Sequence, residues 1–139
     1  MLKKWIPAEK PEKEELKERL KEAERKLEQY QLQMKERKLP VLVLVEGWGS
    51  AGKGSIIGKV IRNIDPRFFR VATMGEPTAE EKRRPFMYRY VAQIPQEGKF
   101  EFLDSGWMDE IVRERFTGEL DEEEYAKRVE SVRRFERQL

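Results

Sequence analysis

A glycine-rich segment, placed between an aliphatic run and a helical pattern, constrains this chain more than any other feature. Residues 47–53 read GWGSAGK and fit the pattern GxxxxGK. The preceding run 41–45 is continuously aliphatic, which predicts a strand buried on both faces. The apolar residues of 56–64, which follow the segment, have helical spacing. A strand, a glycine-rich turn and a helix in this order direct backbone N–H groups toward an anion, so they predict a phosphate-binding loop.

The residues of this loop have separate expected roles. The predicted phosphate-binding residues are Gly47, Gly49, Ser50, Ala51, Gly52, Lys53, Gly54 and Ser55. Lys53 is also a candidate catalytic residue, because its ammonium group would reach a β- or γ-phosphate. Gly54 stands where Ser or Thr normally holds magnesium, and Ser55 comes one position later. The alternative to a phosphate-binding loop is a glycine-rich strand–helix turn that binds nothing. The sequence also leaves open whether Trp48 covers the phosphate site or packs beneath it.

The rest of the chain alternates strands with helices. Further strands are predicted at 68–74 and 100–104. A helix is predicted at about 79–93, with Pro85 near its middle or marking a break, another from Ser105 or Asp109 to residue 116, and a last one capped by Asp121. Alternation of this kind predicts a parallel sheet with right-handed crossovers. The expected fold class is therefore α/β, a P-loop NTPase-like three-layer α-β-α arrangement. Only three strands are predicted, so the domain looks truncated.

The N-terminal segment is more highly charged than the rest of the chain. Residues 10–38 predict a long, highly charged helix, which Pro40 ends. Its narrow apolar seam has the 4-3-4-3-4 spacing typical of helix pairing and consists of Leu16, Leu20, Ala23, Leu27, Tyr30 and Met34. The seam would either dock on the domain or pair with another chain or module. We predict two units, a charged helix over 1–38 and a P-loop kinase-like domain over 39–139, incomplete at its C-terminus.

Charge and composition exclude several function classes. The net charge is +2 with both signs interleaved, and no basic stripe or tail is present, so we expect no nucleic-acid partner. The absence of cysteine excludes disulfides and thiolate metal sites, and the absence of histidine removes the usual general base near neutral pH. No apolar run approaches the roughly 20 residues of a membrane span, and the start lacks a signal-peptide pattern. We therefore expect a cytoplasmic protein without membrane partners.

Two acidic residues at strand ends are candidates for the site. Asp104 closes the third predicted strand, where an acid in P-loop proteins lies near magnesium, so it is our candidate catalytic and metal-binding residue. An Asp at this place is also a common helix cap or turn former. Glu46 ends the first strand and would either compete for the ion or pair with Arg or Lys.

From residue 39 onward the chain resembles the polyphosphate kinase 2 family. The motifs that carry the resemblance are Gly52-Lys53-Gly54, Asp65-Pro66-Arg67, Pro77-Thr78 with Glu81, Pro85-Phe86, Arg89-Tyr90, Pro95 with Gly98, Asp104 with Trp107, Glu114-Arg115, Gly118 and Phe135-Glu136. The resemblance implies a P-loop phosphotransferase that uses Mg²⁺ and moves phosphoryl groups between polyphosphate and nucleoside mono- or diphosphates. It also implies that Arg89 is catalytic, and that the chain assembles as a homo-oligomer or with a second kinase-like module.

Three positions depart from the family pattern. Gly49 stands where the family's loop usually has an Asp, and Ser105 and Met108 replace an Arg and a Tyr of the third-strand motif. In this respect the chain is similar to the degenerate first module of two-module polyphosphate:AMP phosphotransferases. Two hypotheses follow: a phosphotransferase domain with weak or no activity alone, or a non-catalytic structural or regulatory P-loop module that pairs with an active one. The sequence decides neither whether this chain is an active enzyme nor which nucleotide accepts the phosphate.

Overall fold

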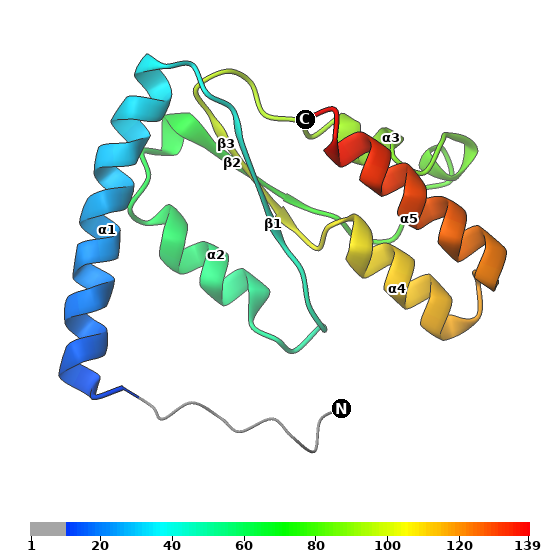
Figure 1. The fold of residues 1–139 in the computed structure, drawn as a ribbon, viewed down its shortest axis with the longest axis horizontal. Helices are drawn as coiled ribbons and strands as arrows, with labels where there is room; N and C mark the ends of the chain where they lie inside the picture. Colours follow the sequence, from blue (N-terminus) through cyan, green and yellow to red (C-terminus); the bar gives the residue numbers. More distant parts are fainter. Residues whose placement is uncertain (1–10) are drawn as a thin grey trace.

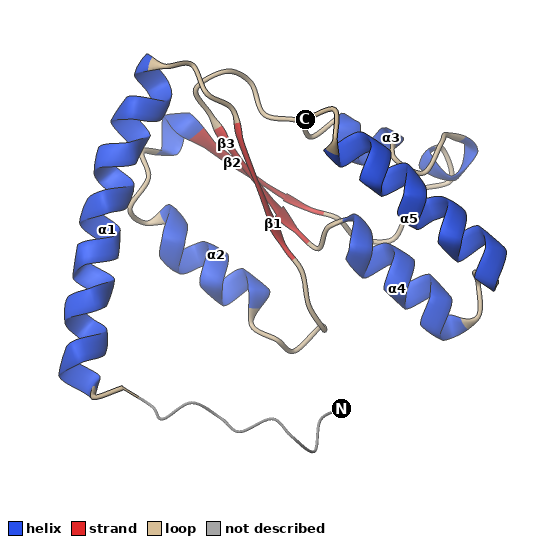
Figure 2. Ribbon diagram, viewed as in Figure 1, coloured by secondary structure: helices blue, strands red, loops and turns tan. Residues whose placement is uncertain are grey.

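Three parallel strands form the centre of the computed structural model, which describes residues 11–139. The strands are β1 (Val41–Val45), β2 (Phe69–Thr73) and β3 (Phe100–Asp104), and their order in the sheet is β1-β3-β2 (Figure 2). Because β3 pairs with both neighbours, its residues are the most deeply buried of the three strands. The predicted parallel sheet is confirmed.

Helices cover both faces of the sheet (Figure 1). Their bounds are α1 (Lys13–Glu36), α2 (Lys53–Ile61), α3 (Tyr88–Val91), α4 (Trp107–Thr117) and α5 (Glu122–Glu136), with 3₁₀ helices at Pro66–Phe68 and Glu81–Arg83. Asp121 caps α5 as predicted, because its carboxylate accepts a hydrogen bond from the backbone N–H of Glu124 at 2.8 Å. None of the helices within residues 11–139 is long and apolar enough to cross a bilayer.

One predicted helix is broken at Pro85, which is one of the two alternatives that the sequence left open. The segment 79–93 does not form a continuous helix but splits into the 3₁₀ helix Glu81–Arg83 and the short α3. The cause is Pro85, because the residue before a proline is driven out of the helical region. Arg84 accordingly has φ −104° and ψ 160°, which is extended backbone.

The alternation of side chains along β3 divides the core between two layers. Phe100 and Phe102 face α1 and α2, where they form a buried cluster with Met34, Ile57 and Ile64. Leu103 faces the opposite layer. The buried cluster there consists of Tyr90, Leu103, Trp107, Ile111, Leu120 and Val132, which come from β3, from α3–α5 and, for Leu120, from the turn between α4 and α5. The chain therefore has the predicted three-layer α-β-α arrangement.

The apolar seam of α1 is only partly buried. Met34 lies in the core cluster and Leu27 packs against it, whereas Leu16 and Leu20 are exposed. The division into units 1–38 and 39–139 remains a prediction, and residues 1–10 lie outside the described part of the chain.

The register of the sheet determines where the site can form. Val45 and Thr73 both pair with Asp104, so all three strands end at one edge. The glycine-rich loop follows β1, Met74 and Gly75 follow β2, and the start of α4 follows β3. In open parallel sheets, ligands bind outside the carboxyl ends of the strands, which makes this edge the place to look for a site.

Candidate functional site

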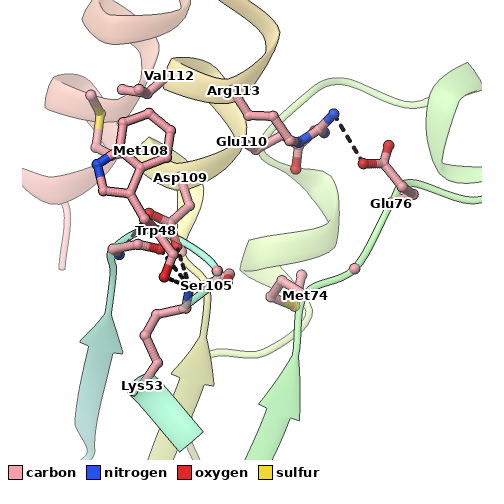
Figure 3. Close-up of a pocket in the computed structure, with 14 residues that line it drawn as sticks. Trp48, Lys53, Met74, Glu76, Ser105, Met108, Asp109, Glu110, Val112 and Arg113 are labelled. Carbon is pink, nitrogen blue, oxygen red and sulfur yellow. Dashed lines mark hydrogen bonds and ion pairs between the residues drawn. The ribbon is translucent and has the colours of Figure 1, made fainter. Parts of the chain in front are cut away.

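A cavity of about 460 Å³ lies at the carboxyl edge of the sheet (Figure 3). Three segments far apart in sequence line it: the loop after β1, the residues 74–76 after β2, and the residues 105–113 that begin α4. Gly47, Gly49 and Lys53, all predicted from the sequence to bind phosphate, belong to this lining. The cavity is thus built on the loop that the sequence singles out.

The glycines of the loop allow its shape. Gly47 has φ +150° and Gly52 has φ +85°, values that side-chain-bearing residues rarely adopt. Between them a tight turn is closed by the backbone N–H of Ala51, which donates to the carbonyl of Trp48 at 2.9 Å. Gly52 then caps α2, which begins at Lys53, so the unpaired N–H groups of the first helical turn lie next to the loop.

Lys53 folds back over the loop. Its side chain is only 12% exposed, and its ammonium group donates to the carbonyls of Gly47 and Trp48. The same nitrogen lies 3.6 Å from Oδ2 of Asp109, and Oδ1 of Asp109 accepts from the backbone N–H of Gly47 at 2.9 Å. Lys53 and the first glycine of the loop are therefore held together by one carboxylate of α4.

The sequence offered no direct sign of this role for Asp109. It lies 62 residues from Gly47, and the contact exists because β1 and β3 are neighbours in the sheet. The usable signal would have been an acidic residue in the first turn of a helix that follows a buried strand.

Asp104 lies beside the start of α2. A Cβ atom added to Gly54 would lie 3.8 Å from Oδ2 of Asp104, so this carboxylate faces the helix end of the loop. Within residues 11–139, no three acidic, His or Cys side chains gather closely enough to hold a metal ion. Mg²⁺, however, is commonly bound by one or two carboxylates together with substrate phosphates and water. Asp104 fits that kind of site, and its metal role remains a prediction.

Arg89 is buried one layer behind the cavity. Its guanidinium is 7% exposed, lies 3.1 Å from the Glu110 carboxylate and 3.6 Å from that of Glu81, and donates to the carbonyl of Gly75 at 2.7 Å. The hydroxyl of Tyr90 donates to the same Glu110 oxygen at 2.6 Å, and burial strongly raises the pKa of this tyrosine. Glu110 lines the cavity, whereas Arg89 does not. Contact of Arg89 with a substrate phosphate therefore remains a prediction, and it requires this network to rearrange.

Glu46 has a partner that neither sequence hypothesis named. Its carboxylate accepts from the backbone N–H of Met108, at 2.9 Å, in the first turn of α4. Partial desolvation raises the pKa of the Glu46 carboxyl above its ordinary value. A Cβ atom on Gly106 would overlap Oε1 of Glu46, so a side chain at this position would force the Glu46 carboxylate to shift. Glu46 thereby ties the end of β1 to the helix that follows β3.

Trp48 lies at the rim of the cavity and does not pack beneath the loop. Its side chain is 69% exposed, and its ring meets that of Phe116 edge to face at 6.2 Å between centroids. All three positions that depart from the family pattern, Gly49, Ser105 and Met108, also line the cavity. The cavity consequently lacks an acidic side chain at 49 and a basic one at 105.

Comparison with known proteins gives a consistent result. The family model described as polyphosphate kinase 2 matches residues 10–139. A polyphosphate:AMP phosphotransferase of Pseudomonas syringae pv. tomato is 33% identical over 99 residues, which cover 71% of this chain and 20% of that protein. An ADP-polyphosphate phosphotransferase of Pseudomonas aeruginosa is also 33% identical over 99 residues, which cover 71% of this chain and 33% of the relative. The match thus takes in only a fifth to a third of these relatives' lengths.

Two crystal structures share the fold. A polyphosphate kinase 2 structure from Pseudomonas aeruginosa PA01 superimposes with a TM-score of 0.86 and 25% identity, covering 99% of this chain and 30% of that one. Another, from Arthrobacter aurescens TC1, gives a TM-score of 0.86 and 26% identity over 97% of this chain and 50% of that one.

Proposed function

Because this chain belongs to the polyphosphate kinase 2 family, we propose that its cavity binds a phosphate group of polyphosphate or of a nucleotide. The binding would serve phosphoryl transfer between polyphosphate and nucleoside mono- or diphosphates. One observation carries the proposal: Lys53 and the N-terminus of α2 meet the glycine-rich loop in a cavity at the carboxyl edge of the sheet. Backbone N–H groups, a helix N-terminus and a lysine are the groups that phosphate loops use.

The other residues of the site have supporting roles in this proposal. Asp104 would hold Mg²⁺, which would neutralise charge on the phosphate groups when bound. Lys53 would leave the loop carbonyls and contact the phosphate as a point charge. Arg89 would act only if its ion pair with Glu110 opened.

We infer that the catalytic power of this chain alone is weak. Phosphoryl transfer depends on positioned charge, and neither Gly49 nor Ser105 supplies any. The same observation favours the second candidate function, a non-catalytic structural or regulatory module that retains the anion site and pairs with an active kinase module.

The assembly that we propose rests on surfaces left open among residues 11–139. The outer edge of β1 pairs with no strand of the described sheet, and Leu42 and Leu44 beside it border a second cavity, of about 330 Å³. Leu16 and Leu20 of α1 are also exposed. A second copy of the chain or a second kinase-like module would cover these surfaces. A sedimentation experiment that finds only a 16.6 kDa monomer at every concentration would contradict a homo-oligomer.

Thermal unfolding with polyphosphate tests the proposed function. A ligand that binds only the folded chain, at about ten times its Kd, should raise the free energy of unfolding by about 1.4 kcal/mol and raise Tm accordingly. Lys53→Ala should reduce this increase, because the point charge at the loop is lost. Lys59→Ala is the matched control, since it removes an exposed lysine from the last turn of the same helix. Equal melting with and without polyphosphate, or a full increase in Lys53→Ala, would contradict the proposal.

A further inference from the structure

The anion site of the loop already contains a negative charge. The Asp109 carboxylate accepts the backbone N–H of Gly47 through Oδ1, and its Oδ2 lies 3.6 Å from the Lys53 ammonium group. These two donors belong to the loop and line the cavity with Asp109 (Figure 3). A carboxylate therefore lies where the proposed phosphate would receive its contacts.

Capping of its own helix does not account for this position of Asp109. Asp109 lies in the first turn of α4, where an acidic side chain can accept from the helix's free N–H groups. That role belongs to Glu46, whose carboxylate accepts a hydrogen bond from the backbone N–H of Met108 at the start of the helix. Among residues 11–139, the only hydrogen bond of the Asp109 carboxylate goes to the loop, and its buried Oδ2 has no hydrogen-bond donor.

The cavity offers a second position for the carboxylate. Arg113 lies four residues further along α4 and lines the same cavity, and residues at this spacing are neighbours on a helix surface. Its guanidinium is 37% exposed and pairs with Glu76 at 2.9 Å. An Asp109 side chain that leaves the loop would therefore find a cation within reach.

We propose that Asp109 is an internal competitor for the phosphate site: its carboxylate occupies the loop, and a ligand phosphate binds only by displacing it. The proposal rests on the proposed function, because it takes the loop to be a phosphate site. It deepens that function by naming the residue that sets the affinity. A terminal phosphate group of polyphosphate or of a nucleotide carries more negative charge than one carboxylate, so it can displace Asp109 at a cost that lowers the apparent affinity.

Titration calorimetry with inorganic tripolyphosphate tests the proposal. Asp109→Asn removes the charge and keeps an oxygen that Gly47 can contact, whereas Asp109→Ala removes both. Each variant should bind tripolyphosphate about tenfold or more tightly than the parent chain, the effect expected for one hydrogen bond to a charged group. Glu80→Gln is the matched control, since it removes one negative charge from an exposed ion pair with Arg84 and touches neither the loop nor Arg113. It should change the affinity less than about threefold, as for an exposed ion pair.

The possible outcomes distinguish failure of the competition by Asp109 from failure of the proposed phosphate binding. Equal affinities in the parent chain and in the Asp109 variants would overturn the competition but not the phosphate site, as would an equal gain in Glu80→Gln. Weaker binding in both Asp109 variants, with unchanged melting temperatures, would show instead that Asp109 holds the loop in its binding shape. Absence of binding in all of them would overturn both the inference and the proposed function. If Asp109→Asn does not fold, Asp109→Ala still decides between these outcomes.

Discussion

Replacing Arg89 by methionine is expected to lower the free energy of unfolding by about 3–5 kcal/mol, the usual cost of removing one partner of a buried ion pair. Arg89 is 7% exposed and Glu110 is 9% exposed, so the remaining carboxylate would lie in the protein interior without its cation. Within the described part of the chain, the hydroxyl of Tyr90 would be its only remaining side-chain donor. Methionine keeps most of the side-chain volume, so the loss should reflect the charge rather than a cavity. Urea unfolding followed by circular dichroism measures the change.

Two further variants make this result specific. Arg113→Met removes a half-exposed arginine that pairs with Glu76, and it should cost less than about 1 kcal/mol. Combining Arg89→Met with Glu110→Gln should recover part of the lost stability, because no unpaired charge is then buried. If Arg89→Met changed stability by less than about 1 kcal/mol but weakened polyphosphate binding, Arg89 would be a substrate contact, as the family resemblance implies, and not a structural one.

Turnover by residues 1–139 alone should fall far below the ordinary enzyme range of about 1–1,000 per second. Removal of a single group that stabilises transition-state charge typically costs about 100- to 1,000-fold in rate. This chain has no acid at Gly49 and no arginine at Ser105, both of which line the cavity. A steady-state assay with polyphosphate, magnesium and AMP or ADP measures the rate. Turnover within the ordinary range would show that these departures do not limit catalysis.

The variant Gly49→Asp, which restores the missing acid, tests the same explanation in the opposite direction. A Cβ atom added to Gly49 meets no atom within 4 Å, so an aspartate fits there without displacing its neighbours. Gly49→Asp should raise the rate if the missing acid limits catalysis. If the folded variant binds polyphosphate but stays inactive, the non-catalytic module becomes the better description of this chain.

The sequence predicts the elements of the fold whose signals are local. The aliphatic run of β1 and the buried strand β3 lie where the pattern places them, because burial on both faces requires continuous apolar residues. The loop glycines are predictable for a similar reason, since positive φ at Gly52 restricts the residue type. Pro85 likewise indicates a break in the segment 79–93, but the sequence alone does not decide between a break and a helix that continues through the proline.

Contacts between distant segments could not be predicted from local signals. Asp109 reaches Gly47 across 62 residues only because β3 inserts between β1 and β2 in the sheet. The burial of Arg89 depends likewise on Glu110, 21 residues further along the chain. A sequence pattern shows which residue types are present, whereas strand order decides which of them meet.

The central claim is that the loop after β1 binds phosphate, and amide chemical shifts test it most directly. In ¹⁵N-labelled protein titrated with inorganic polyphosphate, the amide signals of Gly47, Gly49 and Gly52 should shift and saturate together, because these residues form the loop on which the proposed site is built. The shifts should largely disappear in Lys53→Ala and persist in Lys59→Ala. Unchanged loop amides at saturating polyphosphate, or shifts confined to other parts of the chain, would contradict the account.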